Sequence, residues 1–294
     1  MEMDLTLAEM IAAAGKPVSV SGGGEYTGID LRGVRRIAGE SGKTPREVEI
    51  AALRQGIIPL RYYRNIASLG LDGQARLLSS TAAVVGAGGL GGLIIELLAR
   101  IGVGRLILID GDSFTEDNLN RQLLCREGDI GRKKIERAVE RVAEVNSAVE
   151  VTARPVFLTA ENAAELLAGA GVVIDALDRI GVRILLEEAA NRLSIPLVHG
   201  AIGGFMGQVA VVFPGEETLS SSIYRGEGDQ ASRGIEAVLG TPTITPAVVA
   251  SLEAMEAVKI LLGRGTPLEN ELLYLDLESA EFSRIGLKGG GDGD

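Results

Sequence analysis

Cysteine, histidine and aromatic residues are scarce in this chain. Its 294 residues include one cysteine, one histidine and no tryptophan, and aromatic residues make up 3% of the total. A lone cysteine excludes an intramolecular disulfide framework, and one cysteine with one histidine excludes a structural zinc site of the usual cysteine-rich type. Hydrophobic residues make up 46% of the chain, so we expect an apolar core, rather than cross-links or zinc, to stabilise the fold.

Positive charge is also in short supply. Lysine and arginine number 29 against 40 aspartates and glutamates, which gives a net charge of −11. This balance argues against a dedicated nucleic-acid surface, although a local basic patch is compatible with it. No apolar run is long enough to cross a bilayer, and the segment MEMDLTLAEM lacks the basic region that begins a secretory signal. Since there is also only one cysteine, we expect a cytoplasmic protein without a membrane partner.

Glycine, in contrast, is abundant, with 40 residues, and one glycine-rich turn stands between two apolar runs. The turn, GAGGLG at residues 86–91, is followed by an apolar segment typical of a helix and then by an apolar run that ends in Asp110. In a parallel sheet this order predicts a nucleotide site: backbone amides of the turn and the helix N-terminus approach phosphate, and the acid binds ribose hydroxyls. The glycines of the turn are Gly86, Gly88, Gly89 and Gly91.

The residues after Asp110 favour one kind of nucleotide over another. The glycine pattern alone is typical of NAD and FAD sites, and also of tight strand-to-helix turns. A dinucleotide needs no polar cluster beyond the strand end, whereas the charge of a triphosphate calls for arginine, lysine and a metal. Such a cluster is present, and we therefore predict ATP rather than NAD. It consists of Asp112, Asn118, Arg121 and Gln122.

The rest of the chain alternates strand-like and helix-like segments, which predicts an α/β fold with a Rossmann-like, mostly parallel sheet and helices on both faces. A long segment, 214–246, is predicted to be a mobile loop over the site. The expected strands are 82–85, 105–109, 150–153, 172–175, 197–199 and 207–213, with a closing β-hairpin at 272–277 and 282–285. The expected helices are 90–101, 133–145, 160–168, 181–192 and 247–262.

Residues 1–60 are predicted to form a small N-terminal helical extension. Thr44, Pro45 and Glu47 make a capping box that opens a helix running to about residue 55, and 31–39 is predicted to be another short helix. Two short helices are also compatible with a DNA-binding helix-turn-helix. The acidic chain favours a helical hairpin that packs on the main domain.

Several motifs in one consistent order resemble the E1-type adenylating family. Besides GAGGLG they are IDGDSFTEDNLNRQ at 109–122, GRKK at 131–134 and DALDR at 175–179, with RYYRN at 61–65 upstream and SLEAMEAVKILLG at 251–263 downstream. That family includes the bacterial activators of ubiquitin-like sulfur carriers and the eukaryotic ubiquitin E1 enzymes. The resemblance implies an adenylation domain over 61–288, and the glycine-rich segment GGGDGD that follows it, 289–294, is predicted to be a disordered tail.

The resemblance also implies an activity. We expect ATP-dependent adenylation of the C-terminal carboxylate of a small ubiquitin-like sulfur-carrier protein, with ATP and Mg²⁺, without zinc, in a homodimer. Arg64 would reach into the partner subunit's ATP site. The implied ATP-binding residues are the four glycines, Asp110, Asp112, Asn118, Arg121, Gln122 and Lys134; the catalytic residues are Arg64, Arg121 and Lys134; and the metal ligand is Asp178.

The sequence departs from the family at three places. Arg179 stands where the family usually has asparagine, which leaves the exact environment of the metal open. The paired CxxC motifs of many relatives are missing. Relatives that form a thioester place a cysteine in the loop near residue 236, where this chain has none. We therefore expect no thioester, a structural role for Cys125, and a buried histidine with satisfied hydrogen bonds at His199.

Other functions remain compatible with the same residues. An adenylating dehydratase acting on threonylcarbamoyl-tRNA also works without a thioester, but the acidic chain disfavours tRNA. A peptide-modifying adenylating enzyme is a second possibility. A non-catalytic module that binds NAD or a partner protein is a third, and the joint retention of Arg64, Asp110, Arg121, Lys134 and Asp178 speaks against it.

Overall fold

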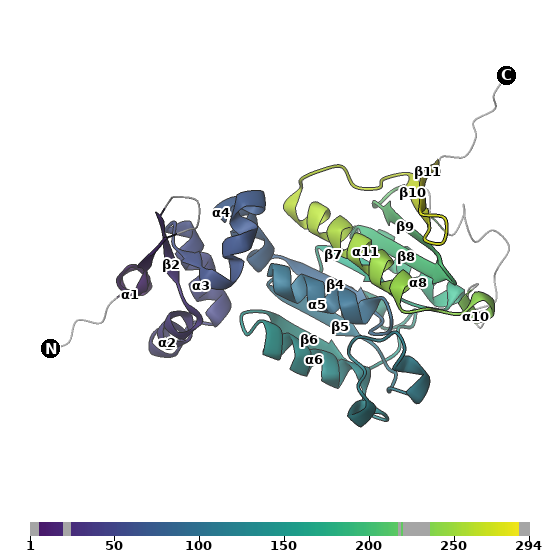
Figure 1. Ribbon diagram of the computed structural model, residues 1–294, viewed down its shortest axis with the longest axis horizontal. Coiled ribbons are helices and arrows are strands. Elements are labelled where there is room, and N and C mark those ends of the chain that lie inside the picture. The colour runs from purple at the N-terminus through teal and green to yellow at the C-terminus, as the bar shows by residue number, and fades with distance from the viewer. Residues whose placement is uncertain (1–5, 20–24, 217–218, 220–235, 288–294) are drawn as a thin grey trace, which may run out of the picture.

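The computed structural model in Figure 1 describes residues 6–19, 25–216, 219 and 236–287. The predicted loop at 214–246 and the predicted tail at 289–294 lie largely or wholly outside the described residues. Within the described ranges, no helix is both long and apolar enough to cross a membrane.

An eight-stranded sheet forms the centre of the molecule, in the order β11-β10-β9-β8-β7-β4-β5-β6. Neighbours from β6 to β8 pair in parallel, and β9, β10 and β11 pair antiparallel. The predicted parallel sheet with a closing hairpin is thus confirmed. The strands are β4 Thr81–Val85, β5 Arg105–Ile109, β6 Glu150–Arg154, β7 Val172–Asp175, β8 Leu197–Gly203, β9 Met206–Val212, β10 Glu271–Asp276 and β11 Glu281–Gly286.

Helices cover both faces of this sheet, as predicted. Successive residues of a strand point to opposite faces, and β4 shows this directly: Val84 belongs to one buried apolar cluster and Val85 to the other. Strands buried on both faces need continuous apolar runs, and this is why β4 and β5 were recognisable. The first cluster lies under α5 Gly91–Ile101, α6 Lys134–Val145 and α11 Ile244–Leu262, and the second under α7 Ala163–Leu167 and α8 Ile180–Arg192.

The N-terminal extension has its own small core and contains more than helices. The capping box of Thr44 and Glu47 is present, with both reciprocal hydrogen bonds. The prediction of a purely helical extension missed a three-stranded sheet, because these strands are short and follow no clear apolar alternation. The elements are α1 Leu7–Ala14, β1 Lys16–Ser19, β2 Glu25–Ile29, α2 Leu31–Ser41, α3 Pro45–Arg54 and β3 Ile58–Pro59.

The extension packs on the main domain, in agreement with the helical-hairpin interpretation. Arg46 of α3 forms an ion pair with Glu150 of β6, at 2.9 Å between Nε and Oε1. Buried Glu49 of α3 lies 3.3 Å from Arg61 Nε, and Arg61 also donates to the side chain of Asn146 at the end of α6. Burial raises the pKa of Glu49 to about 7, against a smaller lowering effect of Arg61.

A turn and a helix that the sequence did not predict connect the two parts. They are η1 Leu60–Tyr62 and α4 Tyr63–Ser79, shown between the extension and the sheet in Figure 1. Gly70 interrupts α4 with a φ of 72° and a ψ of 173°, so the apolar periodicity of one helix is broken into two short pieces. For this reason the sequence pattern did not predict α4.

Candidate active site

A cavity of about 620 Å³ opens at the carboxyl ends of the parallel strands. It lies where the chain order changes direction, because β5 and β6 follow β4 on one side and β7 lies on the other. Ligands of open α/β sheets bind at such switch points. Gly86 after β4, Asp110 after β5 and Asp178 after β7 all line it.

The backbone approaches itself closely at two positions of the glycine turn, and both positions require glycine. Gly86 has a φ of 100°, and a Cβ there would lie 2.4 Å from the carbonyl oxygen of Ala176. A Cβ on Gly91 would lie 1.8 Å from the carbonyl oxygen of Gly86. Gly91 is therefore needed for packing the start of α5 on the turn, and it is not among the lining residues, whereas Gly86, Gly88 and Gly89 are.

Asp110 ties the turn to the loop after β5. Its Oδ2 accepts the backbone N–H of Ala87 and its Oδ1 that of Asp112, both at 2.7 Å. A carboxylate oxygen has more than one lone pair, so both oxygens can still accept hydrogen bonds from ribose hydroxyls.

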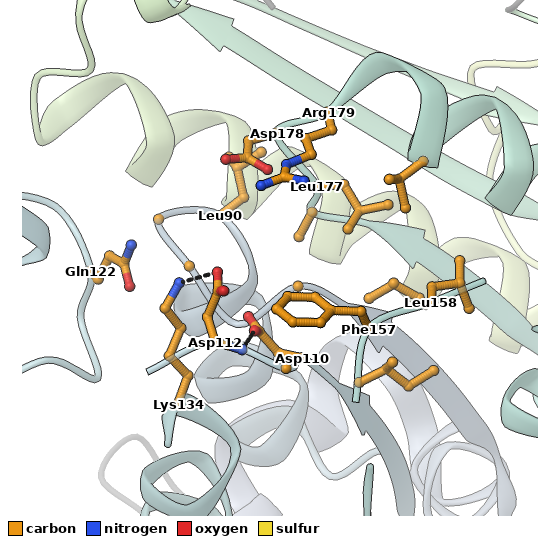
Figure 2. Close-up of a pocket in the computed structure, with 18 of the residues that line it drawn as sticks. Leu90, Asp110, Asp112, Gln122, Lys134, Phe157, Leu158, Leu177, Asp178 and Arg179 are labelled. Carbon is orange, nitrogen blue, oxygen red and sulfur yellow. Dashed lines mark hydrogen bonds and ion pairs between the residues drawn. The ribbon is translucent and has the colours of Figure 1, made fainter. Parts of the chain in front are cut away.

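Lys134, rather than its neighbour Lys133, lies on the cavity. Its side chain is 9% exposed and its Nζ lies 3.2 Å from Asp112 Oδ2, a contact drawn in Figure 2. Lys133 instead donates to the backbone oxygen of Gly111 at 2.6 Å and does not line the cavity. Asp112 therefore holds a mostly buried cation at the cavity wall.

The segment after β5 contributes three more lining residues, Asp117, Arg121 and Gln122. Among the described residues, Arg121 donates to the carbonyl of Asp117 at 2.8 Å and to Asn120 Oδ1 at 2.9 Å, and its charge also acts on the nearby Asp117 carboxylate. The buried Oε1 of Gln122 has no hydrogen-bond partner among the described residues. A guanidinium with no hydrogen bond to a carboxylate among the described residues and an unpaired buried amide oxygen are both suited to a polar ligand.

Asn118 has a different position from the one predicted. It does not line the cavity; its Oδ1 accepts the backbone N–H of Thr115 at 3.2 Å and closes the short helix η2 Glu116–Asn118. Its side chain shapes the segment that carries Arg121, and the structure does not bring it to the ligand space.

The opposite wall carries Asp178 and Arg179, as Figure 2 shows. Both side chains are exposed and line the cavity, and no described residue forms an ion pair with either. The turn before them is fixed at Leu177, whose N–H donates to Asp175 Oδ1 at 3.1 Å and whose carbonyl accepts from Arg183. Hydrogen bonds to Asp175 and Arg183 thus fix the backbone of this wall.

A buried polar cluster forms that support. His199 Nδ1 lies 2.9 Å from Asp175 Oδ2, and Gln208 Nε2 lies 3.3 Å from His199 Nε2, which fits a neutral imidazole that donates from Nδ1 and accepts at Nε2. Burial lowers the pKa of His199 and raises that of the neighbouring Glu253 well above its ordinary value. Although burial opposes it, Arg183 holds the pKa of Asp175 below its ordinary value. The prediction of a buried, hydrogen-bonded histidine is confirmed.

Among the carboxylates that line the cavity, Asp178 is exposed and has no ion-pair partner among the described residues. The described residues contain no group of three or more His, Cys, Asp or Glu side chains that would hold a metal by themselves. Mg²⁺ does not need one, because it commonly takes one or two carboxylates together with substrate phosphates and water. An exposed, unpaired carboxylate at the cavity wall fits that ligand set.

Phe157 is a lining residue that the sequence did not single out. It follows β6, is 64% exposed, and lies so close to Gly111 that a Cβ there would be 2.8 Å from the ring. Figure 2 places the ring beside Asp110. Its position just after a parallel strand was the available signal, since that edge of the sheet forms the site.

Neither Cys125 nor Arg64 lines the cavity of its own chain. Cys125 is buried, and burial together with Asp129 raises the pKa of its thiol, as expected for a structural cysteine. Arg64 is exposed on α4 and its guanidinium carbon lies 5.5 Å from the ring centre of Tyr63.

Known proteins are similar to this chain over most of its length. The model of the ThiF family matches residues 62–289. The chain belongs to the ThiF family. The sulfur carrier protein adenylyltransferase of Thermus thermophilus is 40% identical over 237 residues, which cover 76% of this chain and 86% of the relative. The SAMP-activating enzyme E1 of Haloferax volcanii is 36% identical over 227 residues, or 76% of this chain and 84% of the relative.

Solved structures share the fold. PaaA has a TM-score of 0.65 at 23% identity, with 78% of this chain and 82% of that chain covered. MccB of E. coli with ATP has a TM-score of 0.66 at 20% identity, with 77% and 71% covered. Together with its named relatives, the ThiF-family assignment makes this chain an ATP-dependent adenylyltransferase and sets aside the non-catalytic NAD-binding alternative.

Proposed function

We propose that this ThiF-family enzyme adenylates the C-terminal carboxylate of a small ubiquitin-like sulfur-carrier protein in the cytoplasm. The observation that carries the proposal is the single cavity that combines the glycine turn, Asp110, Arg121 and Lys134. The names of the relatives from Thermus thermophilus and Haloferax volcanii support the kind of substrate.

The reaction needs phosphate positioning and charge neutralisation more than it needs a protein nucleophile. A carboxylate oxygen of the carrier attacks the α-phosphorus of ATP, the bond to the β-phosphate oxygen breaks, and an acyl-adenylate and pyrophosphate form. Amides of the glycine turn orient the α-phosphate. Lys134, Arg121 and Arg179 stabilise the negative charge that develops on the leaving pyrophosphate. Cys125 takes no part, and no thioester forms on this chain.

The remaining lining residues hold the nucleoside and the metal. Asp110 accepts hydrogen bonds from the ribose hydroxyls, and the ring of Phe157 stacks on the adenine. Asp178 would hold Mg²⁺, which when bound supplies further positive charge at the phosphates. Asn118 acts only through the shape of its turn.

The working unit in this proposal is a homodimer with two shared sites. Arg64 is exposed on α4 and has no carboxylate partner among the described residues, and it does not reach the cavity of its own chain. In a two-fold symmetric dimer, each Arg64 would complete the partner's cavity. Mixing an Arg64→Ala chain with an Asp178→Ala chain should then restore activity through one intact site per heterodimer; verified subunit exchange without recovery would contradict a shared site.

The substrate is tested by ATP–pyrophosphate exchange with purified ubiquitin-like carriers that end in Gly-Gly. The matched control is the same carrier without those two residues, which offers a different carboxylate. Exchange with the intact carrier alone supports the proposal. Exchange that requires tRNA or a short peptide instead, with none for any carrier, would replace the proposed substrate, and calorimetry that detects NAD but no ATP binding would contradict the adenylation mechanism.

A further inference from the structure

The two arginines of the RYYRN segment lie in different environments. Arg61 is only 21% exposed at its side chain and contacts Glu49 and Asn146, so it belongs to the interface between the extension and the main domain. Arg64, one helical turn later, is exposed. A long exposed side chain loses rotamer entropy when it binds, so an arginine that acts in another subunit's site benefits from being held in place.

A tyrosine stack leads from the N-terminal extension to this arginine. Tyr26 of β2 and Tyr63 of α4 have ring centres 4.5 Å apart and planes inclined by only 6°. The Arg64 guanidinium carbon lies 5.5 Å from the centre of the Tyr63 ring, within the range of a cation–π contact. The chain has only five tyrosines, and two of them are placed here.

Backbone pairing between two strands also joins the extension to the segment that carries Arg64. Strand β2 pairs in parallel with β3, through Gly28 with Ile58 and Ile29 with Pro59, and β3 runs directly into η1 and α4. A Cβ on Gly28 would lie 2.5 Å from the side chain of Leu60, so β2 is pressed against the residues that precede Arg64. Both tyrosines are half-buried, and neither is part of the apolar clusters formed by the described residues.

We propose that the N-terminal extension positions Arg64 through Tyr26 and Tyr63, so that Tyr26 is a positioning residue for the partner subunit's ATP site. This proposal rests on the proposed function, in which Arg64 completes that site. The extension thus gains a role in the reaction, although it lies at the end of the molecule away from α10 Glu236–Leu239 in Figure 1.

The test compares binding of ATP–Mg²⁺ and of AMP to the dimer by calorimetry, because AMP lacks the phosphates that become pyrophosphate. Arg64→Ala should weaken the binding of ATP about tenfold to a hundredfold, which is the effect of losing a charged hydrogen bond, and should leave the affinity for AMP unchanged. Tyr26→Ala should weaken the binding of ATP about twofold to tenfold, which is the range for the loss of an aromatic pair, and should not change the affinity for AMP. Tyr26→Phe keeps the ring and should bind as the parent does.

Two further variants separate positioning from folding. Adding Tyr26→Ala to Arg64→Ala should cause no additional loss, since the stack acts only through the arginine. Tyr274→Ala removes another half-buried tyrosine, on β10, and should leave both affinities intact. If Tyr26→Ala does not fold, Tyr26→Leu keeps apolar bulk without the aromatic face and takes its place.

The outcomes distinguish the two proposals. Loss of ATP affinity in Arg64→Ala but not in the Tyr26 variants would overturn the positioning role and leave the shared site intact. An equal loss of ATP and AMP affinity in Tyr26→Ala would also overturn it, because the effect would then be general. Unchanged ATP affinity in Arg64→Ala would overturn the shared site itself, and no ATP binding by the parent would overturn the proposed function.

Discussion

Glu49 provides a test of how the extension is joined to the main domain. Its carboxyl is buried in α3 beside Arg61 and Tyr62, which both act to lower its pKa, although neither of its oxygens has a hydrogen bond of good geometry within the described chain. Burial raises its pKa from 4.5 to about 7, more than Arg61 can offset. The folded protein therefore keeps a proton on Glu49 at pH values where the unfolded chain has lost it.

The sign and size of the effect follow from this difference. Where the folded state binds one proton more than the unfolded state, the free energy of unfolding falls by about 1.4 kcal/mol for each pH unit. The stabilising contribution is complete below the unfolded pKa of 4.5 and is lost as the pH rises through about 7. As the pH rises across this window, the titration of Glu49 lowers the free energy of unfolding by about 3 kcal/mol.

Glu49→Gln keeps the shape of the neutral acid and does not titrate. Relative to the parent it should be nearly neutral at about pH 4 and more stable by about 3 kcal/mol at about pH 8, as measured by urea unfolding at several pH values. Glu188→Gln, an exposed change on α8, is the matched control and should give a small, pH-independent difference. A Glu49→Gln variant that becomes less stable than the parent as the pH rises would show that the Arg61 pair outweighs burial and refute the reasoning.

Four further changes test the site. Lys134→Ala should lower pyrophosphate exchange by about a hundredfold or more, whereas Lys133→Ala, which removes a lysine outside the cavity, should retain most of it. Asp110→Ala should weaken ATP about tenfold in calorimetry by removing a hydrogen-bonding anchor of the glycine turn, and an unchanged affinity would exclude it from the site. Cys125→Ser should leave exchange intact, and a thioester trapped at Cys125 in the parent would contradict the mechanism. Phe157→Trp would give the chain its only tryptophan, whose fluorescence should change on adding ATP if residue 157 stacks on the base.

The main sheet was predictable because its strands have to be apolar on both faces. Continuous runs such as 82–85 and 105–109 are recognisable without any alternation, and the short connections then fix which strand ends meet. Asp110 was predicted from its place at the end of such a strand, after the glycine turn, whereas Asp178 and Lys134 were assigned from the resemblance to the adenylating family. Phe157 was not found, because an aromatic residue after a strand has the same pattern as any core residue.

The extension was less predictable, for two physical reasons. Strands β1 and β2 are only four and five residues long, and neither has a regular alternation of buried and exposed residues, so they carry no periodicity that separates them from loops. Asn118 illustrates the second reason: its place in a family motif indicates importance, but a side chain that closes a turn and one that binds a ligand look the same in sequence. Only the hydrogen bond to Thr115 separates the two roles.

Arg64 is a predicted site residue that does not line the cavity of its own chain. The cavity wall made by Asp178 and Arg179 is exposed, while Arg64 lies on α4, outside the cavity lining. An exposed arginine is ordinary, but this one ends a stack that begins in the extension, and a surface arginine without function needs no such support. In the proposed dimer, Arg64 would complete the exposed side of the partner's cavity, which would explain why its guanidinium is supported on its own chain by the tyrosine stack.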